Sequence, residues 1–273
     1  MSNATVTAQG GGLSATVAEI LATAGRRLRH LRRAPGRFIG ITLNPLVSMI
    51  VLGYLFQRSI LIPGGGSYQE FLFAGAALQV GLAGVGPTAV AVATDLKGGL
   101  IDRFRSMPIS RGAVLIGHTL ADLVVGVFAL AIVTGFGLLL GWRPHTGILG
   151  TLAGFGVLVV FIYVILWLGV LLGMASKSLE TIDSISSLIV VVLPFLSSAF
   201  LSAEYLPGWL RPVAEWNPIS AVATACRQLW GNPGANGDSF AITNSALVVI
   251  VSLGVLFLLT SVQSLRRYRS AAV

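Results

Sequence analysis

The spacing of charged residues constrains this chain more than any other feature. Only 10% of its 273 residues are charged, against roughly 25% in an average soluble domain. Six windows of at least 20 residues hold no charge, and about 20 apolar residues suffice for a helix to cross a bilayer. The windows begin at Phe38, Phe71, Leu123, Pro144, Ser184 and Ser239. We therefore predict six membrane spans and no large soluble domain.

The spans are predicted to be helices rather than the strands of a barrel. The run from Leu158 to Met174 is apolar on all sides, whereas a barrel strand alternates apolar and polar residues. Glycine is abundant, at 33 residues, which suits helices that pack closely in lipid. The predicted fold class is an all-α integral membrane protein, with a six-helix domain over residues 38–273.

The first 37 residues are predicted to lie outside the spans. Residues 1–12 are polar and Gly-rich, a composition typical of disorder. Over residues 13–37, apolar residues recur every three or four positions while arginines fall elsewhere around the helix. This pattern predicts an amphipathic helix at the membrane interface. A solvated targeting helix is the alternative.

The basic residues predict an orientation. Fourteen of the 18 cations lie before the first window, after the second, after the fourth, or in the C-terminal tail. Because Lys and Arg concentrate in cytoplasmic loops, we expect both termini and these loops to be cytoplasmic. This arrangement explains the net charge of +8 without a nucleic-acid partner.

Residues 204–238, on the opposite side, are too apolar for a plain solvated loop. Trp209, Trp216 and Trp230 alternate there with prolines. Tryptophan concentrates at membrane interfaces, and irregular backbone at membrane depth must be covered by protein. We therefore predict two short re-entrant helices before the last span.

The cytoplasmic loop over residues 95–111 is predicted to contain a docking helix. Two apolar residues in it, Ile101 and Phe104, stand at helical spacing, and Pro108 would end the helix. The residues that flank them are charged: Asp102, Arg103 and Arg105. A short amphipathic helix can lie on lipid or insert into a groove of a partner protein, and the mixed charge favours the groove.

Few strongly polar side chains fall within the spans, which favours a hydrophobic or amphipathic cargo over a hydrophilic one. Asn44, Gln79 and Asp122 are candidates for lining a conduit, because polar groups in a membrane usually face a partner or water. Asp122 is expected near the cytoplasmic end of the third span. Glu204 is a candidate outer gate, with a solvated helix-end carboxylate as the alternative.

No metal site or catalytic residue is predicted. His118 and Asp122 are four residues apart and would share a helix face, but two ligands are too few for a metal site. Asp95 and Asp102 could belong to an intramembrane enzyme that binds a divalent cation. The neighbouring Lys97 would repel such a cation, as would Arg103 and Arg105.

The whole arrangement resembles the ABC-2 type exporter permeases, and within them the daunorubicin-resistance permeases and mycobacterial lipid-export permeases. The residues that carry the resemblance are the 95–111 loop, with its run RFRSMPIS from Arg103 to Ser110, and the run EYLPGWLRPVAEWNPIS from Glu204 to Ser220. The resemblance implies a bacterial cytoplasmic membrane location. It also implies a coupling helix that contacts an ATP-hydrolysing subunit through Asp95, Ile101, Asp102, Arg103, Phe104, Arg105, Ser106, Met107 and Pro108.

The same resemblance implies an assembly of two permease chains, identical or homologous, with two P-loop ATPase subunits that bind ATP and Mg. This chain carries no GxxxxGK[ST] motif, so we expect it to use ATP hydrolysed by a separate chain. The function predicted is export of a hydrophobic or amphipathic drug or lipid from the cytoplasm or inner leaflet. The alternatives are an intramembrane lipid-processing enzyme and a passive channel.

Overall fold

The computed structural model describes residues 35–57, 62, 65–97, 111–234 and 239–270, and all regular secondary structure in these ranges is helical. Two predictions fall outside them: the disordered segment 1–12 and nearly all of the interfacial helix over residues 13–37. Most of the docking helix, residues 98–110, also lies outside the described residues.

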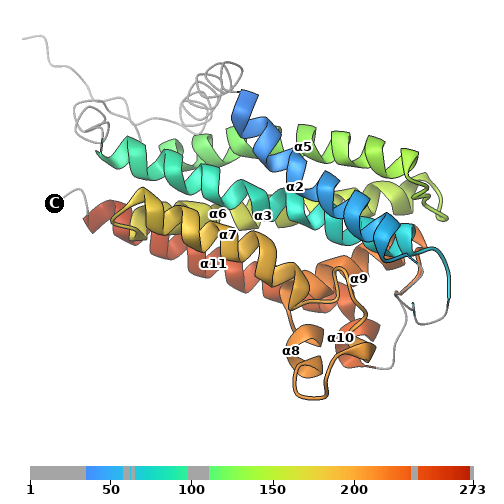
Figure 1. The fold of residues 1–273 in the computed structure, drawn as a ribbon. Helices are drawn as coiled ribbons and strands as arrows, with labels where there is room; N and C mark the ends of the chain where they lie inside the picture. Colours follow the sequence, from blue (N-terminus) through green and yellow to red (C-terminus); the bar gives the residue numbers. More distant parts are fainter. Residues whose placement is uncertain (1–34, 58–61, 63–64, 98–110, 235–238, 271–273) are drawn as a thin grey trace, which may run out of the picture.

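Five described helices are long and apolar enough to cross a membrane, which makes the chain a multi-pass membrane protein. They are α2 (Pro35–Ile50), which continues as the π-helix η1 (Val51–Leu55), α3 (Tyr68–Lys97), α5 (Arg111–Leu139), α6 (Ile148–Ala175) and α11 (Ser245–Ser270). They run side by side in one bundle (Figure 1).

The fifth predicted span forms a shorter helix than the other spans. α7 (Leu179–Phe195) has 17 residues, a length of about 25 Å at 1.5 Å per residue, against about 30 Å for the hydrocarbon core. It begins at Ser178, whose hydroxyl accepts a hydrogen bond from the backbone N–H of Thr181 at 3.1 Å. The structure therefore contains the predicted helix, but not at the length of a complete span.

Two predicted boundaries were wrong. The third charge-free window begins at Leu123, but α5 begins at Arg111 and its apolar span at Leu115. Asp122 lies within this span, as expected, but the span begins seven residues before it. The last window begins at Ser239, where the structure has the short helix α10 (Phe240–Thr243), a break at Asn244 and then α11.

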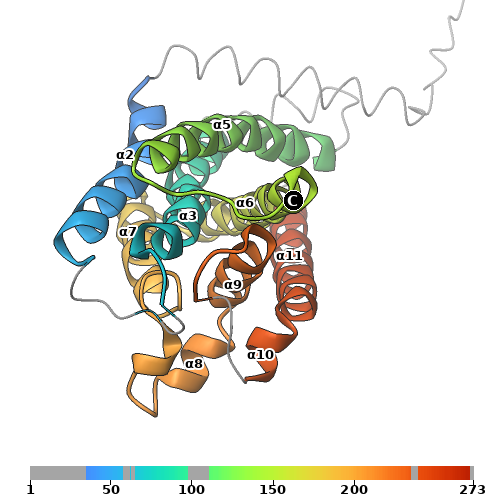
Figure 2. The same cartoon turned by 90° about the vertical axis from the view of Figure 1, so that its right-hand side faces the viewer.

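α3 is the central helix of the bundle. It packs against α2, α5, α6, α7 and α9, and Figure 2 shows these helices around it. It packs most extensively against α6, where Gly169 and Gly173 face the backbone of α3. A Cβ on Gly169 would lie 2.8 Å from the Val85 carbonyl oxygen. Small residues spaced by four let membrane helices approach this closely.

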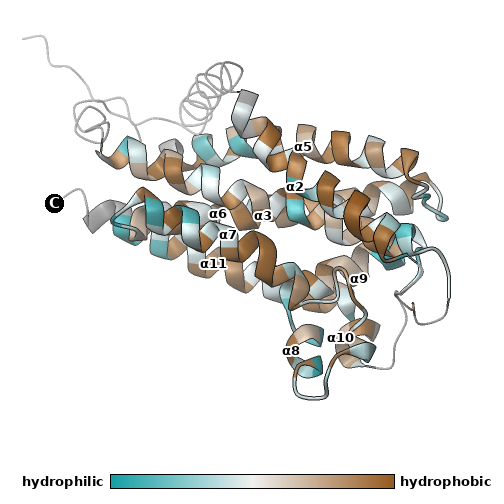
Figure 3. Cartoon of the chain, viewed as in Figure 1, coloured by the Kyte–Doolittle hydropathy of each residue, from teal (hydrophilic) through white to brown (hydrophobic). Residues whose placement is uncertain are grey.

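The outward faces of the long helices are apolar. Figure 3 shows hydrophobic residues along much of the length of α2, α5 and α11. Phe128 on α5 and Ile250 on α11 are 63% and 73% exposed. In water such faces would be unfavourable, whereas in a bilayer they contact lipid tails or another subunit.

A group of short helices, which we call the cap, lies beyond the ends of α7 and α11 that are far from the C-terminus (Figure 1). We define the cap as residues 196–234 and 239–244. It contains the 3₁₀ helix η2 (Ala203–Tyr205), α8 (Arg211–Glu215), α9 (Pro218–Trp230) and α10. α8 and α10 project from it to one side of the bundle (Figures 1 and 2). The predicted outer segment, residues 204–238, therefore does hold short helices, of which α9 is the longest.

Capping residues fix where α9 begins and ends. The Asn217 side chain accepts a hydrogen bond from the Ile219 N–H at 2.9 Å, Pro218 occupies the first turn, and Gly231 ends the helix with a φ of 66°. An N-cap, an early proline and a C-terminal glycine are the expected signals for both ends. Trp230 then packs in an aromatic cluster, edge-on against Trp142 and tilted against Phe73 and Phe155. This cluster joins the cap to α3, to α6 and to the turn that follows α5.

Candidate functional site

The predicted site residues fall into three groups. The coupling residues Ile101, Asp102, Arg103, Phe104, Arg105, Ser106, Met107 and Pro108 lie outside the described residues. Asp95, Asp122, Gln79 and Asn44 lie in the bundle. Glu204 lies in the cap.

Asp122 is buried at the contact between α3 and α5. Its side-chain carboxylate accepts a hydrogen bond of 2.7 Å from the Thr88 hydroxyl. The two residues line a cavity of about 10 Å³ together with Gly84 and Gly126, which is close to the minimum space for a single water. A hydroxyl donor offsets part of the cost of holding a carboxylate inside the membrane.

A second polar contact lies nearer the end of α3. His118, one turn before Asp122 on α5, places its Nε2 atom 3.5 Å from a carboxylate oxygen of Asp95. His118 is buried, whereas the Asp95 side chain is 39% exposed. Among the predicted coupling residues, Asp95 is the one that the structure describes. It contacts His118, which is buried inside the bundle.

The other conduit candidates lie apart from this pair. Gln79 is buried on α3, and its Oε1 atom has no hydrogen-bond partner among the described residues. Asn44 is half-buried on α2, one residue before Pro45. Neither lines the small cavity at Asp122. Among the described residues, no three His, Cys, Asp or Glu side chains gather in a group that could hold a metal ion.

Thr88→Val is expected to lower the free energy of unfolding by about 2 kcal/mol, because a buried polar group that loses its hydrogen-bond partner costs roughly 1–3 kcal/mol. Valine keeps the shape of the side chain and removes the hydroxyl group. Thermal unfolding in detergent, followed by tryptophan fluorescence, measures the change. Thr94→Val is the matched control, since Thr94 is exposed and its hydroxyl donates to the Val90 carbonyl of its own helix. Equal losses in the two variants would show that the Asp122 contact contributes nothing.

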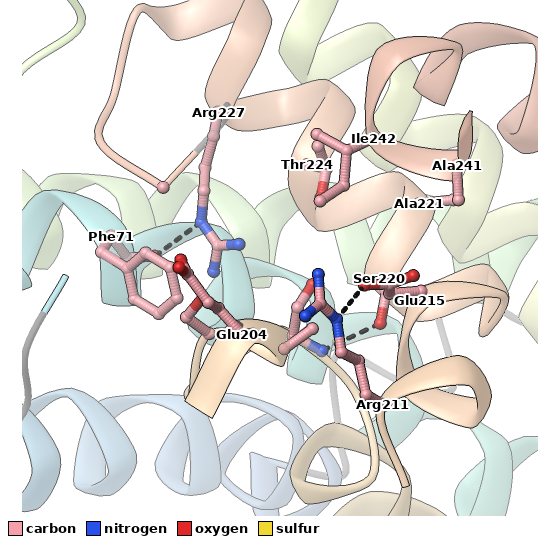
Figure 4. A pocket seen from close by; sticks show the side chains of 14 residues that line it. Phe71, Glu204, Arg211, Glu215, Ser220, Ala221, Thr224, Arg227, Ala241 and Ile242 are labelled. Atoms are coloured by element: carbon pink, nitrogen blue, oxygen red, sulfur yellow. Dashed lines mark hydrogen bonds and ion pairs between the residues drawn. The ribbon is translucent and has the colours of Figure 1, made fainter. Parts of the chain in front are cut away.

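The cap encloses a larger cavity, of about 190 Å³, that the sequence did not predict. Figure 4 shows its lining, to which Glu204, Arg211, Glu215 and Arg227 contribute. Arg211 pairs with Glu215 at 2.7 Å, one turn apart on α8, and this hydrogen bond raises the pKa of Arg211. The carboxylate of Glu204 makes no ion pair within 4 Å in the part of the chain that the structure describes.

Arg227 is the functional candidate that sequence reasoning missed. Its side chain is fully buried, its Nε donates to the Phe71 carbonyl at 3.1 Å, and its Nη2 donates to the Ala199 carbonyl at 2.8 Å. The guanidinium carbon also lies 3.7 Å from the centre of the Phe71 ring. Burial lowers the pKa of Arg227 to about 9, so the group remains charged at neutral pH. Arg227 therefore ties α9 to α3 and to the residues that follow α7.

The family model described as ABC-2 type transporter matches residues 18–230. The chain belongs to this family. The match covers the bundle from α2 to α9, so Asp122 and Arg227 lie within the part of the chain that defines the ABC-2 type.

Three curated relatives are similar over most of the chain. The daunorubicin resistance ABC transporter permease protein DrrB1 of Streptomyces coeruleorubidus is 32% identical over 89% of this chain and 86% of its own length. The probable doxorubicin resistance ABC transporter permease protein DrrC of Mycobacterium tuberculosis is 22% identical over 77% and 76%. A putative transport permease, ycf38, of Pyropia yezoensis is 23% identical over 81% and 76%. The resemblance to drug-resistance permeases is thus confirmed.

Proposed function

We propose that this chain is the transmembrane permease subunit of an ATP-driven exporter, which moves a hydrophobic or amphipathic drug or lipid out of the cytoplasm or inner leaflet. The family match over residues 18–230 carries this proposal. The names of the relatives DrrB1 and DrrC, which refer to daunorubicin and doxorubicin resistance, support a cargo of this kind. The apolar helices of the bundle are consistent with loading from the bilayer.

The proposal includes six crossings, with both termini in the cytoplasm of a bacterium. α6 ends at Ala175 and the chain reverses into α7, which runs back toward the cap (Figure 1). α11 then begins near the cap and ends at the opposite end of the bundle. If α7 with the residues that follow it is counted as a crossing, the chain makes an even number of passes. The positive-inside rule puts the Arg-rich ends in the cytoplasm.

The energy is proposed to come from two P-loop ATPase subunits, which bind ATP and Mg and dock on the loop over residues 95–111 of two permease chains. Asp95 supports this placement, because it lies in the last turn of α3, where that loop begins, and contacts His118 inside the bundle. A force on the loop would therefore reach the buried contacts between α3 and α5.

Vesicles that contain the permease and its cognate ATPase should expel an amphipathic dye when ATP is added. Dye fluorescence measures the rate, and the control is the same ATPase with its P-loop lysine replaced. Equal efflux with the active and inactive ATPase would contradict ATP-driven export and favour a passive channel.

Phe104→Ala and Arg105→Glu are each expected to weaken ATPase binding about 30-fold, because aromatic and Arg anchors at an interface often contribute roughly 2 kcal/mol or more. The permease itself should remain folded. Co-purification and ATPase stimulation measure the effect. Arg266→Glu is the control, since Arg266 is an exposed charge at the same end of the bundle on α11. Full ATPase stimulation by both loop variants would exclude the loop as the coupling element.

A further inference from the structure

The cap cavity contains a buried cation with an unused donor. The Nη1 atom of Arg227 has no hydrogen-bond partner among the described residues, although its Nε and Nη2 atoms each donate to a carbonyl oxygen. The guanidinium points into the space that the lining residues surround (Figure 4). A buried charge without an anionic partner is costly, so this donor favours an anionic group from outside the chain.

Hydroxyl groups lie in the same wall. The Ser198 hydroxyl is buried and has no partner in the described part of the chain. The Ser220 hydroxyl accepts a hydrogen bond from the Ser198 N–H at 2.8 Å, which leaves its own hydrogen available. Thr224 adds a third hydroxyl to the lining. A guanidinium with several hydroxyl donors is the chemistry that binds phosphate oxygens.

Two acidic residues, Glu204 and Glu215, also line the cavity. Glu215 is neutralised by Arg211 at 2.7 Å, whereas Glu204 is exposed and forms no ion pair with the described residues. A purely anionic ligand would be repelled by Glu204. A ligand with a phosphate and an ammonium group would instead satisfy Arg227 and Glu204 together. The volume of about 190 Å³ is far more than the roughly 10–15 Å³ that one water needs.

The surface around the cavity is typical of the headgroup region of a bilayer. Four aromatic residues of the cap are more than half exposed: Tyr205, Trp209, Trp216 and Phe240. Trp216 and Phe240 stack on each other with ring centres 6.1 Å apart. Tyr and Trp prefer the depth at which lipid headgroups lie. The occupant expected at this depth is therefore part of a lipid rather than a free solute.

We propose that the cap cavity binds the zwitterionic headgroup of a phospholipid, with the phosphate oxygens on Arg227 and Ser198 and the ammonium group facing Glu204. This binding is separate from the proposed export and requires neither ATP nor an ATPase. A lipid bound there would hold α9 against α3 and the end of α7.

The test is binding of short-chain phosphatidylethanolamine to the purified full chain in detergent, measured by calorimetry. Phosphatidylglycerol, which lacks the ammonium group, is expected to bind about tenfold more weakly, as one charged contact is lost. Diacylglycerol, which lacks the phosphate, and inorganic phosphate are expected to show no saturable binding. Tight binding of inorganic phosphate would identify a free-anion site and overturn the proposal, and so would equal binding of all three lipids.

Two variants locate the site. Ser198→Ala should weaken phosphatidylethanolamine binding about tenfold, while its backbone N–H can still bond Ser220. Glu204→Gln should abolish the preference for phosphatidylethanolamine over phosphatidylglycerol. The controls are Ser187→Ala and Glu180→Gln, two exposed positions on α7 outside the cavity. Unchanged binding in both cavity variants would overturn the proposal and leave the efflux experiment unaffected.

Discussion

Replacing Arg227 by methionine is expected to lower the free energy of unfolding by about 3 kcal/mol. Arginine makes two hydrogen bonds, to the carbonyls of Phe71 and Ala199, and each hydrogen bond to a charged group contributes roughly 1.5–3 kcal/mol. Relief of the buried charge offsets part of that loss. Methionine fills a similar unbranched volume, so the change tests the bonds rather than a cavity.

The same substitution should release the cap before the bundle unfolds. Arg227 links α9 to α3 and to the residues after α7, so amide hydrogens of α9 should exchange faster in Arg227→Met while those of α6 keep their protection. Hydrogen exchange with mass spectrometry and thermal unfolding in detergent measure the two effects. Arg211→Met is the matched control. Its ion pair with Glu215 is exposed, so water screens it and its loss should change the stability little. If Arg227→Met were as stable as the control, Arg227 would not hold the cap in place.

The long helices could be predicted because charged residues are rare inside a bilayer. The start of the third span was predicted wrongly because one charged residue, Asp122, has a partner inside the bundle. Cutting the sequence at Asp122 placed the start of the third span at Leu123. In the structure α5 continues through Asp122, because Thr88 on α3 donates to the carboxylate. Thr88 is 34 residues away in the sequence, so no local pattern could show that this acid is accommodated inside the bundle.

The C-terminal end of α7 is also determined by residues that are distant in the sequence. The apolar window continues to Ala203, but the helix ends at Phe195. Polar side chains of the cap bond the backbone that follows: Asn217 donates to the Leu196 carbonyl at 3.3 Å, and Ser220 accepts from the Ser198 N–H. These partners replace the bonds that another helical turn would supply. A hydropathy profile contains no information on these hydrogen bonds, so it could not predict where α7 ends.

Arg227 could have been noticed from the sequence, although its role could not. It is the only charged residue between Trp216 and Gly237, in a segment of small and apolar residues. An isolated charge of that kind suggests a buried contact. Its partners Phe71 and Ala199 are backbone carbonyls, however, and any residue supplies a carbonyl. From the sequence alone, Arg227 is one of the four cations outside the predicted cytoplasmic segments.

Gly173→Ala is expected to destabilise the bundle by about 2–3 kcal/mol, the cost of overpacking a closely packed contact. A Cβ on Gly173 would overlap the carbonyl oxygen of Ala89 and lie 3.0 Å from the Ala89 Cα. Both are backbone atoms of α3, so no side-chain rotation can make room and the helices must separate. Because α3 is central, that separation should disturb its contacts with the other helices as well.

Gly156→Ala, on the same helix, is the control, because it is expected to change the stability in the opposite direction or not at all. Gly156 is exposed, and a Cβ there would meet nothing within 4 Å. Alanine favours helix over glycine by roughly 1 kcal/mol, so Gly156→Ala should be neutral or stabilising while Gly173→Ala is destabilising. Thermal unfolding of the two variants in the same detergent measures the difference. A Gly173→Ala protein at least as stable as Gly156→Ala would mean that α3 and α6 do not approach as closely as the glycine spacing allows, and the tight crossing at the centre of the bundle would have to be abandoned.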